Sequence, residues 1–287
     1  MPLVAGKELI NLAENEGIAI GSFNVNNMEI VQAIAEAAEE EASPAILQAS
    51  QGAIKYAGLE YIVSLVYTAS KQISVPIALH LDHGTSFEQN MRCIRKGFTS
   101  VMFDGSAQPL KENIRQTREV VKVGQAVGVS VEGELGKIAG TEDDITVSDR
   151  EAMLTDPQEA AQFSSETGVD YLAVAIGTAH GPYKGEPKLD FDRLTRIKEL
   201  TGVPIVLHGA SGVSEESIGK AIELGVRKIN IDTSLRQAFT SGLKGVIEEN
   251  PGQYDPRKLL GPAKDSMKAV IKEKMRLFGS AGYASKL

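Results

Sequence analysis

The histidines of this sequence fall where buried strands are expected to end. In the stretch LHLDHGTS, Asp82 and His83 close an apolar run, and His180 and His208 follow two later runs of the same kind. Three neutral imidazoles that meet at one point form a catalytic zinc site with one coordination position left for a substrate. The alternative is three separate hydrogen-bonded histidines. The fourth histidine, His80, lies inside a run and is interpreted as a core residue or as a partner of a ligand.

Three carboxylates accompany these histidines. Asp82 could orient His83 as a hydrogen-bond partner, or it could face the substrate and move a proton on a metal-bound carbonyl compound, which we favour. Asp104 and Glu134 end two further apolar runs. Each could ligate a metal in a second or displaced position, or accept a hydrogen bond from the backbone at the rim. These carboxylates therefore predict proton transfer beside a metal.

Glycine-rich turns follow two of the proposed ligands, in His180-Gly181 and in the segment 208–212 (HGASG). A glycine backbone can approach an anion closely, and the amides and hydroxyls of the segment 230–234 (NIDTS) are expected to lie beside it. A short glycine-rich turn is more often a plain connection. In a barrel, however, the loops after strands seven and eight are the usual phosphate site, which favours phosphate binding here.

Eight short apolar runs alternate with stretches of helical spacing. Their near-continuous apolar character is typical of strands buried on both faces of a parallel sheet. Eight strands that alternate with helices most simply close into a (β/α)8 TIM barrel of the α/β class, formed as a single domain by residues 1–287. An open, doubly wound sheet is the alternative, although it rarely needs eight repeats. The predicted strands are 18–25, 44–50, 76–81, 100–103, 130–136, 171–177, 204–208 and 228–232, and the main predicted helices are 28–41, 111–127, 156–167, 191–200 and 214–224.

Other segments complete the expected architecture. Residues 7–16 predict a short helix under the barrel, and residues 265–278 predict a C-terminal helical extension. Residues 137–148 (KIAGTEDDITVS) are polar without a helical pattern and are predicted to form a functional lid. No lysine falls in the carboxyl-terminal half of a predicted strand, since Lys228 opens the eighth. A Schiff-base nucleophile needs a rigid, desolvated setting, so a metal is the favoured means of polarising a carbonyl.

Composition argues against several other classes of protein. The 287 residues carry a net charge of −8 and no basic run, which argues against a nucleic-acid surface but permits a local basic pocket. No apolar stretch approaches the roughly 20 residues that span a bilayer, and the N-terminus does not resemble a secretory signal. We therefore expect a cytoplasmic protein without a membrane partner. Cys93 is the only cysteine, so any metal must be held by histidine and carboxylate.

Six ordered motifs run along essentially the whole chain: HLDHG, ELG with the following GTEDD, GTAHGPYKGEP, VLHGASG, INIDTS and YDPRKLLGP. Together they resemble the class II, metal-dependent fructose-1,6-bisphosphate aldolases. The resemblance implies reversible cleavage of fructose 1,6-bisphosphate to dihydroxyacetone phosphate and glyceraldehyde 3-phosphate through a zinc-stabilised enediolate, in glycolysis or gluconeogenesis. It also implies a homodimer or homotetramer.

The resemblance further implies roles in metal binding and proton transfer. The three rim histidines would bind the zinc, and Asp104 and Glu134 would form an alternative metal position. Asp82 would donate the proton to the aldehyde oxygen during condensation. Glu142, in the GTEDD segment, would take the proton from dihydroxyacetone phosphate. A monovalent cation, Na⁺ or K⁺, could also bind to backbone carbonyls near the glycines that follow two of the histidines.

Substrate-binding roles are implied in the same way. Lys184 would lie near the phosphate of dihydroxyacetone phosphate, Asn24 and Ser50 would contact the other half of the substrate, and Arg257 would bind the second phosphate. The segments that hold dihydroxyacetone phosphate would contribute Gly181, Gly209, Ala210, Ser211, Asn230, Ile231, Asp232 and Thr233.

Three alternatives stay open at this point. Tagatose-1,6-bisphosphate aldolase shares most of the motifs, although Asp232-Thr233 looks more like the fructose enzymes. A metal-dependent barrel hydrolase would also gather histidines on the rim, but it would ordinarily show a His-x-His pair near the first strand, and IAIGSFNV has no histidine. A non-catalytic sugar-phosphate binding protein would show no turnover.

Overall fold

Eight parallel strands close into a barrel in the order β1, β11, β10, β8, β5, β4, β3, β2. The computed structural model describes residues 3–142, 145–148, 153–181, 183, 185 and 187–287. All eight predicted strands are present, so the predicted barrel is confirmed and the open sheet is wrong. The strands are β1 (Ile20–Asn24), β2 (Ala45–Ala49), β3 (Ile77–Gly84), β4 (Ser100–Phe103), β5 (Ser130–Leu135), β8 (Tyr171–Val174), β10 (Ile205–Leu207) and β11 (Val226–Ile231).

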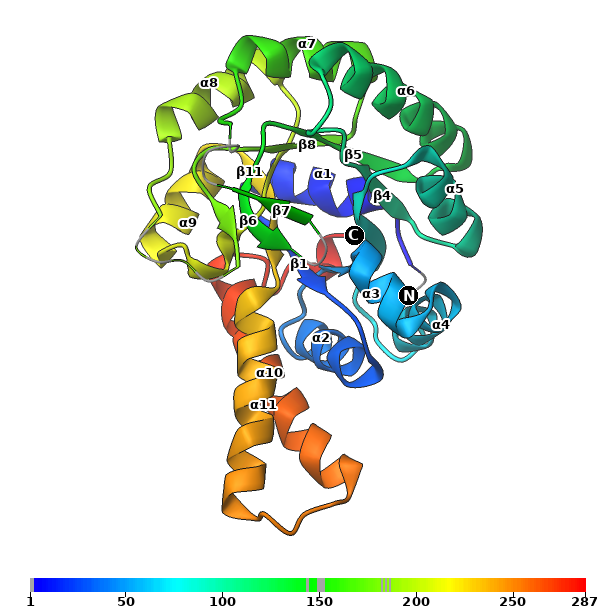
Figure 1. The fold of residues 1–287 in the computed structure, drawn as a ribbon, viewed down its shortest axis with the longest axis vertical. Helices are drawn as coiled ribbons and strands as arrows, with labels where there is room; N and C mark the ends of the chain where they lie inside the picture. Colours follow the sequence, from blue (N-terminus) through cyan, green and yellow to red (C-terminus); the bar gives the residue numbers. More distant parts are fainter. Residues whose placement is uncertain (1–2, 143–144, 149–152, 182, 184, 186) are drawn as a thin grey trace.

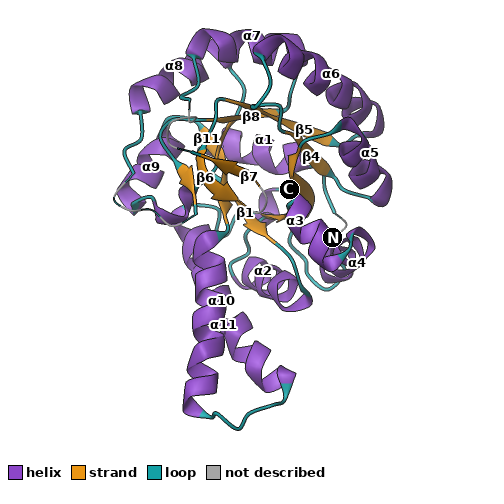
Figure 2. Ribbon diagram, in the orientation of Figure 1, coloured by secondary structure: helices purple, strands orange, loops and turns teal. Residues whose placement is uncertain are grey.

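An outer ring of helices surrounds the strands (Figures 1 and 2). Five of these helices were predicted, and their ends differ from the prediction by at most one residue: α2 (Met28–Glu40), α6 (Leu110–Val127), α7 (Pro157–Thr167), α8 (Phe191–Thr201) and α9 (Glu215–Glu223). Three more, α3 (Gln51–Ala57), α4 (Leu59–Ser70) and α5 (Phe87–Lys96), were not predicted. Helix α5 buries Asn90 and Cys93, and Phe87, Met91 and Ile94 pack against the core at helical spacing, so its sequence carries an apolar signal that the prediction did not use.

Side chains of the barrel strands point alternately outward and inward. The outward side chains are apolar, whereas the inward side chains change from apolar to polar along the strand. Outward residues such as Leu47 and Leu79 belong to the main core against the helices. Inward residues near the amino ends, such as Ile46 and Ala78, form a second, smaller core. Beyond them, the inward positions are polar and buried. These include Gln48, His80, Asp82, Glu132 and Lys228. The strands are therefore less uniformly apolar than the sequence analysis supposed.

Helix α1 (Gly6–Glu16) closes the amino-terminal end of the barrel, as predicted for residues 7–16. Leu9, Ile10 and Ala13 share one helical face and pack into the second core. Glu14 on the same helix forms ion pairs with Lys198 (2.7 Å) and Arg227 (2.8 Å). These contacts leave the carboxyl-terminal end of the barrel as the end that can receive a substrate.

The C-terminal extension is longer than predicted. A helical hairpin of α10 (Thr233–Glu249) and α11 (Pro256–Leu277) projects from the barrel (Figure 1). The prediction began the last helix at residue 265, whereas the observed helix begins nine residues earlier and contains Gly261 and Pro262. The second half of α11 packs on α2 and buries Met267, Ile271 and Met275, whereas the first half extends beyond the barrel with α10.

The predicted lid also differs in detail. The segment after β5 contains an antiparallel hairpin of β6 (Ala139–Glu142) and β7 (Ile145–Val147). Strand β6 then pairs in parallel with β9 (Ala179–His180), with Gly140 opposite His180. The local sequence did not indicate the pairing of β6 with β9, because the two strands lie about forty residues apart in the chain. Among the described residues, no helix is long and apolar enough to cross a membrane.

Candidate active site

A bulge in β3 turns Asp82 and His83 toward the same end of the barrel. In a regular strand, neighbouring side chains point to opposite faces. The pairing of β3 with β4 shifts register between Leu81 and Gly84, and His83 has a φ of 48°. This left-handed conformation is strained for a residue other than glycine. Asp82 keeps the inward direction, and the bulge lets the His83 ring join the other rim histidines.

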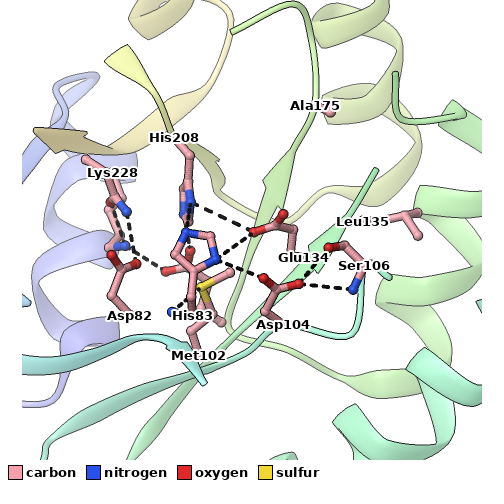
Figure 3. A network of polar contacts seen from close by, with 12 residues as sticks. Asp82, His83, Met102, Asp104, Ser106, Glu134, Leu135, Ala175, His208 and Lys228 are labelled. Atoms are coloured by element: carbon pink, nitrogen blue, oxygen red, sulfur yellow. Dashed lines mark hydrogen bonds and ion pairs between the residues drawn. The ribbon is translucent and has the colours of Figure 1, made fainter. Parts of the chain in front are cut away.

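The three predicted histidines do meet, as Figure 3 shows for His83 and His208. One ligand nitrogen from each of His83, His180 and His208 lies within 4.8 Å of the other two. His83 Nε2 and His208 Nδ1 are 3.2 Å apart. Two imidazole nitrogens bound to one tetrahedral zinc ion would lie about 3.3 Å apart. The spacing therefore fits a shared divalent metal.

The other ring nitrogens of two histidines contact carboxylates. His83 Nδ1 lies 2.9 Å from Asp104 Oδ2, and His208 Nε2 lies 2.8 Å from Glu132 Oε1. A carboxylate only accepts hydrogen bonds, so these nitrogens carry the hydrogens. The two nitrogens that face each other, His83 Nε2 and His208 Nδ1, then both present lone pairs. A divalent ion between them would accept both lone pairs, which supports a metal at this place.

Asp104 and Glu134 form a second possible metal group with His83. Glu134 Oε2 is buried without a hydrogen-bond partner among the described residues and lies 3.8 Å from His83 Nδ1. Burial, together with the nearby Asp104 charge, raises the pKa of Glu134 well above its usual value. Burial alone would also raise the pKa of Asp104, but His83 and Ser106 outweigh it and lower that pKa to about 2. A divalent ion here would neutralise the paired carboxylates.

Asp104 also makes the rim hydrogen bond that was the alternative to metal binding. Its Oδ1 accepts from the Ser106 backbone N–H at 3.0 Å and from the Ser106 hydroxyl at 2.7 Å. These bonds use Oδ1 and leave Oδ2 free to contact His83. The two interpretations of Asp104 are therefore compatible, because different oxygens serve them.

Asp82 is fully buried beside the histidines. Gln48 Nε2 donates to its Oδ2 at 3.0 Å, and Asn230 Nδ2 donates to its Oδ1 at 3.2 Å. The two amides, which come from β2 and β11, fix the plane of the carboxylate. This places an oriented proton acceptor next to the proposed metal position.

The glycine-rich loops and the end of β11 surround a pocket, as predicted for an anion site. Its lining consists of Ala179, His180, Gly181, Gly209, Ser211, Asn230, Asp232 and Thr233. Gly209 has a φ of 65°, and a Cβ there would lie 2.5 Å from the Ala179 carbonyl oxygen. Only glycine fits this close approach. The Asp232 backbone N–H reaches the Ser211 hydroxyl at 3.4 Å, which joins the two loops. The buried Ala210 and Ile231 lie in these same segments.

A larger groove of about 890 Å³ lies between α6 and α7 on the outer surface, and no histidine lines it. We place the chemistry at the rim, where the proposed ligands gather.

Asn24 and Ser50 end β1 and follow β2, close to the same interior. Asn24 Oδ1 accepts from Gln48 Nε2 at 2.5 Å, and its buried Nδ2 has no hydrogen-bond partner among the described residues. Ser50 is the N-cap of α3, where its hydroxyl accepts from the Ala53 backbone N–H at 3.2 Å. Asn24 therefore has a donor to offer a ligand, whereas Ser50 has a local structural role as well.

Three predicted residues are not brought into the site by the described structure. Glu142 ends β6, two residues beyond the Gly140–His180 pair, but its side chain lies outside what the structure describes. Lys184 also lies outside the described residues. Arg257 lies at the start of α11, near the tip of the hairpin, where its exposed side chain pairs with Asp255 at 2.8 Å. Within one chain Arg257 does not line the site.

Sequence reasoning missed three buried residues of this interior: Gln48, Glu132 and Lys228. All three are fully buried. Burial alone would raise the pKa of Glu132, but the Lys228 charge and the His208 hydrogen bond more than offset it, so the pKa is lowered. A signal was present. Alternate residues of a strand share the inner face of the barrel. Gln48, Glu132 and Lys228 each lie two positions before a predicted rim residue, namely Ser50, Glu134 and Asn230.

The chain is similar to known aldolases over almost its whole length. The sequence family described as fructose-bisphosphate aldolase class-II matches residues 4–283. A relative from Thermus caldophilus, named fructose-bisphosphate aldolase, is 48% identical and is matched over 98% of this chain and 100% of its own length. A relative from Alkalicoccus urumqiensis, named sulfofructosephosphate aldolase, is 45% identical over 99% of both chains. The crystal structure of the YdjI aldolase from Escherichia coli K12 superposes with a TM-score of 0.86 at 36% identity, over 98% of this chain and 99% of that one.

Proposed function

Since the chain belongs to the class-II fructose-bisphosphate aldolase family, we propose that its rim site catalyses the reversible cleavage of fructose 1,6-bisphosphate to dihydroxyacetone phosphate and glyceraldehyde 3-phosphate. The observation that carries this proposal is the convergence of three imidazoles beside the buried Asp82 carboxylate. Aldol cleavage needs an electron-withdrawing centre at the carbonyl and a group that exchanges a proton with the hydroxyl at the breaking bond. The site offers both.

Metal dependence belongs to this class, and zinc is the ion we propose. His83, His180 and His208 would hold it through their ring nitrogens, with Asp104 and Glu134 as an alternative position. When bound, the metal withdraws electron density from the substrate carbonyl and so weakens the neighbouring bonds. The same donor set would accept cobalt and other divalent ions in vitro.

Asp82 and Glu142 are the proposed proton-transfer residues. In cleavage, Asp82 takes the proton of the hydroxyl that becomes the aldehyde, and in condensation it returns that proton. Gln48 and Asn230 keep the carboxylate plane fixed during this exchange. Glu142 exchanges the proton on the carbon of dihydroxyacetone phosphate. The pairing of β6 with β9 supports this role, because it ties the lid to the strand of His180.

The pocket beside His180 is the proposed site for dihydroxyacetone phosphate. Backbone amides and hydroxyls from the residue after β9, the loop after β10 and the end of β11 would bind its phosphate. The residues proposed for this role are Gly181, Gly209, Ala210, Ser211, Asn230, Ile231, Asp232 and Thr233. Lys184 would add a positive charge. On the other side, Asn24 Nδ2 and Ser50 would contact the aldehyde half of the substrate. A Na⁺ or K⁺ ion near Gly181 and Gly209 is part of the same proposal.

Arg257 would bind the second phosphate only in the site of a neighbouring subunit, because within its own chain it lies near the hairpin tip. This agrees with the homodimer or homotetramer that we propose. Light scattering coupled to size-exclusion chromatography measures the oligomeric state directly. A strictly monomeric chain with full activity would contradict both parts of this proposal.

One assay tests the proposed activity. We expect the metal-loaded protein to cleave fructose 1,6-bisphosphate, to lose nearly all activity after treatment with a chelator, and to recover it with Zn²⁺. Parallel assays with tagatose 1,6-bisphosphate and sulfofructose phosphate establish the substrate preference. Nothing in the comparisons favours tagatose. Absence of turnover with all three substrates would leave a hydrolase or a sugar-phosphate binding protein, which no present observation favours.

Asp82→Ala separates proton transfer from metal binding. We expect kcat to fall at least about 100-fold, because a positioned acid or base contributes this much, while the content of bound Zn²⁺ stays near that of the parent. Metal analysis and steady-state kinetics on the same sample provide the measurement. Near-normal turnover with retained zinc would remove Asp82 from its proposed role.

A cytoplasmic location and a glycolytic or gluconeogenic role are further proposals, supported by the sugar-phosphate substrates.

A further inference from the structure

A buried ion pair lies directly beneath the proposed metal position. Lys228 Nζ is 2.8 Å from Glu132 Oε2, and both side chains are fully shielded from solvent. The other oxygen of Glu132, Oε1, accepts from His208 Nε2 at 2.8 Å. We propose that Glu132 and Lys228 act together as positioning residues, which fix the His208 ring with Nδ1 toward the metal and hold Asp82 in line through Asn230.

The first part of the inference concerns the His208 ring. A neutral imidazole has one donor and one acceptor nitrogen, and the hydrogen bond at one nitrogen decides the state of the other. Glu132 can only accept, so Nε2 carries the hydrogen and Nδ1 keeps its lone pair. His208 Nδ1 is the nitrogen that lies 3.2 Å from His83 Nε2. Glu132 thus sets both the tautomer and the direction of this ligand.

Lys228 is required because Glu132 is a charge without access to water. Burying a carboxylate is unfavourable unless a counter-charge accompanies it. The described groups that face Glu132 come from three other strands: Lys228 on β11, His208 on β10 and His80 on β3, whose Nε2 is 3.4 Å away. Of these, Lys228 is the lysine that pairs with Glu132 at 2.8 Å and balances its charge.

The same ammonium reaches the proton-transfer residue. Lys228 Nζ donates to Asn230 Oδ1 at 2.8 Å, and a lysine can only donate. The Asn230 amide is therefore oriented with Nδ2 outward, where it donates to Asp82 Oδ1 at 3.2 Å. One buried lysine thus aligns a metal ligand through Glu132 and a carboxylate through Asn230. Neither Glu132 nor Lys228 needs to contact the substrate.

This inference rests on the proposed metal role of His208 but concerns residues beneath it. Its first test uses the unmodified chain. In metal-free protein with ¹⁵N-labelled histidine, we expect the neutral His208 ring to be protonated at Nε2. The His208 signals are assigned by their loss in His208→Gln. Protonation at Nδ1 would overturn the inference without reference to any variant of the ion pair.

The second test removes both charges at once. Glu132→Gln combined with Lys228→Met leaves no unpaired buried charge and retains an amide oxygen near His208. We expect the dissociation constant for Zn²⁺, measured by competition with a chelator, to rise about 10- to 100-fold. At saturating Zn²⁺, kcat should fall, because Asn230 loses the hydrogen bond from Lys228 that orients its amide toward Asp82.

The matched control is Tyr171→Phe. The Tyr171 hydroxyl belongs to the same buried network, 2.5 Å from Ser100, which in turn contacts His80. Its hydroxyl bonds to Ser100 and not to Glu132 or His208, so Zn²⁺ affinity should stay within twofold of the parent. A folded double variant with parental Zn²⁺ affinity and parental kcat would sink the proposal. So would an equal loss of Zn²⁺ affinity in Tyr171→Phe, which would indicate general loosening of the interior.

The outcomes also separate this inference from the proposed function. A chain that binds Zn²⁺ with an Nε2-protonated His208, yet cleaves no sugar phosphate, would contradict the function alone. A chain that cleaves fructose 1,6-bisphosphate, but whose double variant binds Zn²⁺ as the parent does, would contradict the inference alone.

Discussion

Lysine–glutamate pairs occur in two very different regions of this molecule. Inside the barrel, Lys228 and Glu132 form one pair that is fully buried. On the surface, a row of pairs joins α11 to α2, which we call the α2–α11 seam; it consists of Lys264, Lys268, Lys272 and Arg276 facing Glu36, Glu40 and Glu41. The N–O distances are similar in both regions, 2.8 Å in the barrel and between 2.6 and 3.3 Å in the seam.

The difference in environment gives these pairs different roles. In the seam, water screens the charges and several partners are interchangeable, since Lys268 contacts both Glu36 and Glu40. Such pairs contribute little individually. In the barrel, desolvation makes the pair expensive to form and very costly to break. We therefore infer that the buried pair positions its neighbours His208 and Asn230 and adds little net stability. The pairs of the seam hold α11 against α2, and each contributes a small, salt-dependent amount.

Breaking the buried pair is expected to have the largest effect. Lys228→Met leaves Glu132 without its counter-charge and should lower the free energy of unfolding by about 3–5 kcal/mol. Urea denaturation of the metal-free variant and parent measures the change, with thermal unfolding as a check. A loss below about 1 kcal/mol would erase the distinction between the two regions.

The corresponding change in the seam should have a smaller effect. Lys268→Met removes a lysine that contacts Glu36 and Glu40, each at 3.0 Å. We expect a loss of at most about 1 kcal/mol in the same denaturation experiment, because Lys264 and Lys272 remain beside the same carboxylates. Zn²⁺ affinity should not change. An effect as large as that of Lys228→Met would show that the seam is more than a surface contact.

Acid and salt should produce the smallest effect, and only in the seam. Hydrogen bonds from Lys272 and Lys268 lower the pKa of Glu40 below the usual value for a glutamate. A carboxyl with a lowered folded-state pKa contributes stability that is present above its unfolded pKa. That contribution is lost as the pH falls through the lower, folded value. The stability difference between the parent and Glu40→Gln should therefore shrink below pH 4.5 and in high salt. If the stability difference between the parent and Glu40→Gln stayed the same at low pH and in high salt, the pairs of the seam would not be solvent-screened ion pairs.

Predictability from sequence also differs between the regions. The barrel strands and the three histidines could be predicted, because each strand carries its own apolar run and each histidine stands at its end. Glu132 and Lys228 were missed although they lie in phase with Glu134 and Asn230 along their strands. Each looks like an ordinary polar residue until the closed sheet puts it inside. The predicted helix at 265–278 missed the start of α11, which contains Gly261 and Pro262, two residues that local propensity disfavours inside a helix.

The sequence by itself determined which segments become strands and helices and which side chains reach the rim, because these properties depend on spacing along a few consecutive residues. Only the tertiary structure decided the partners. It set His83 Nε2 opposite His208 Nδ1, joined the lid strand β6 to β9, and placed Arg257 away from its own site. Such contacts join residues far apart in the chain, and their distances follow from barrel closure, the β3 bulge and the helical hairpin, which no local pattern encodes.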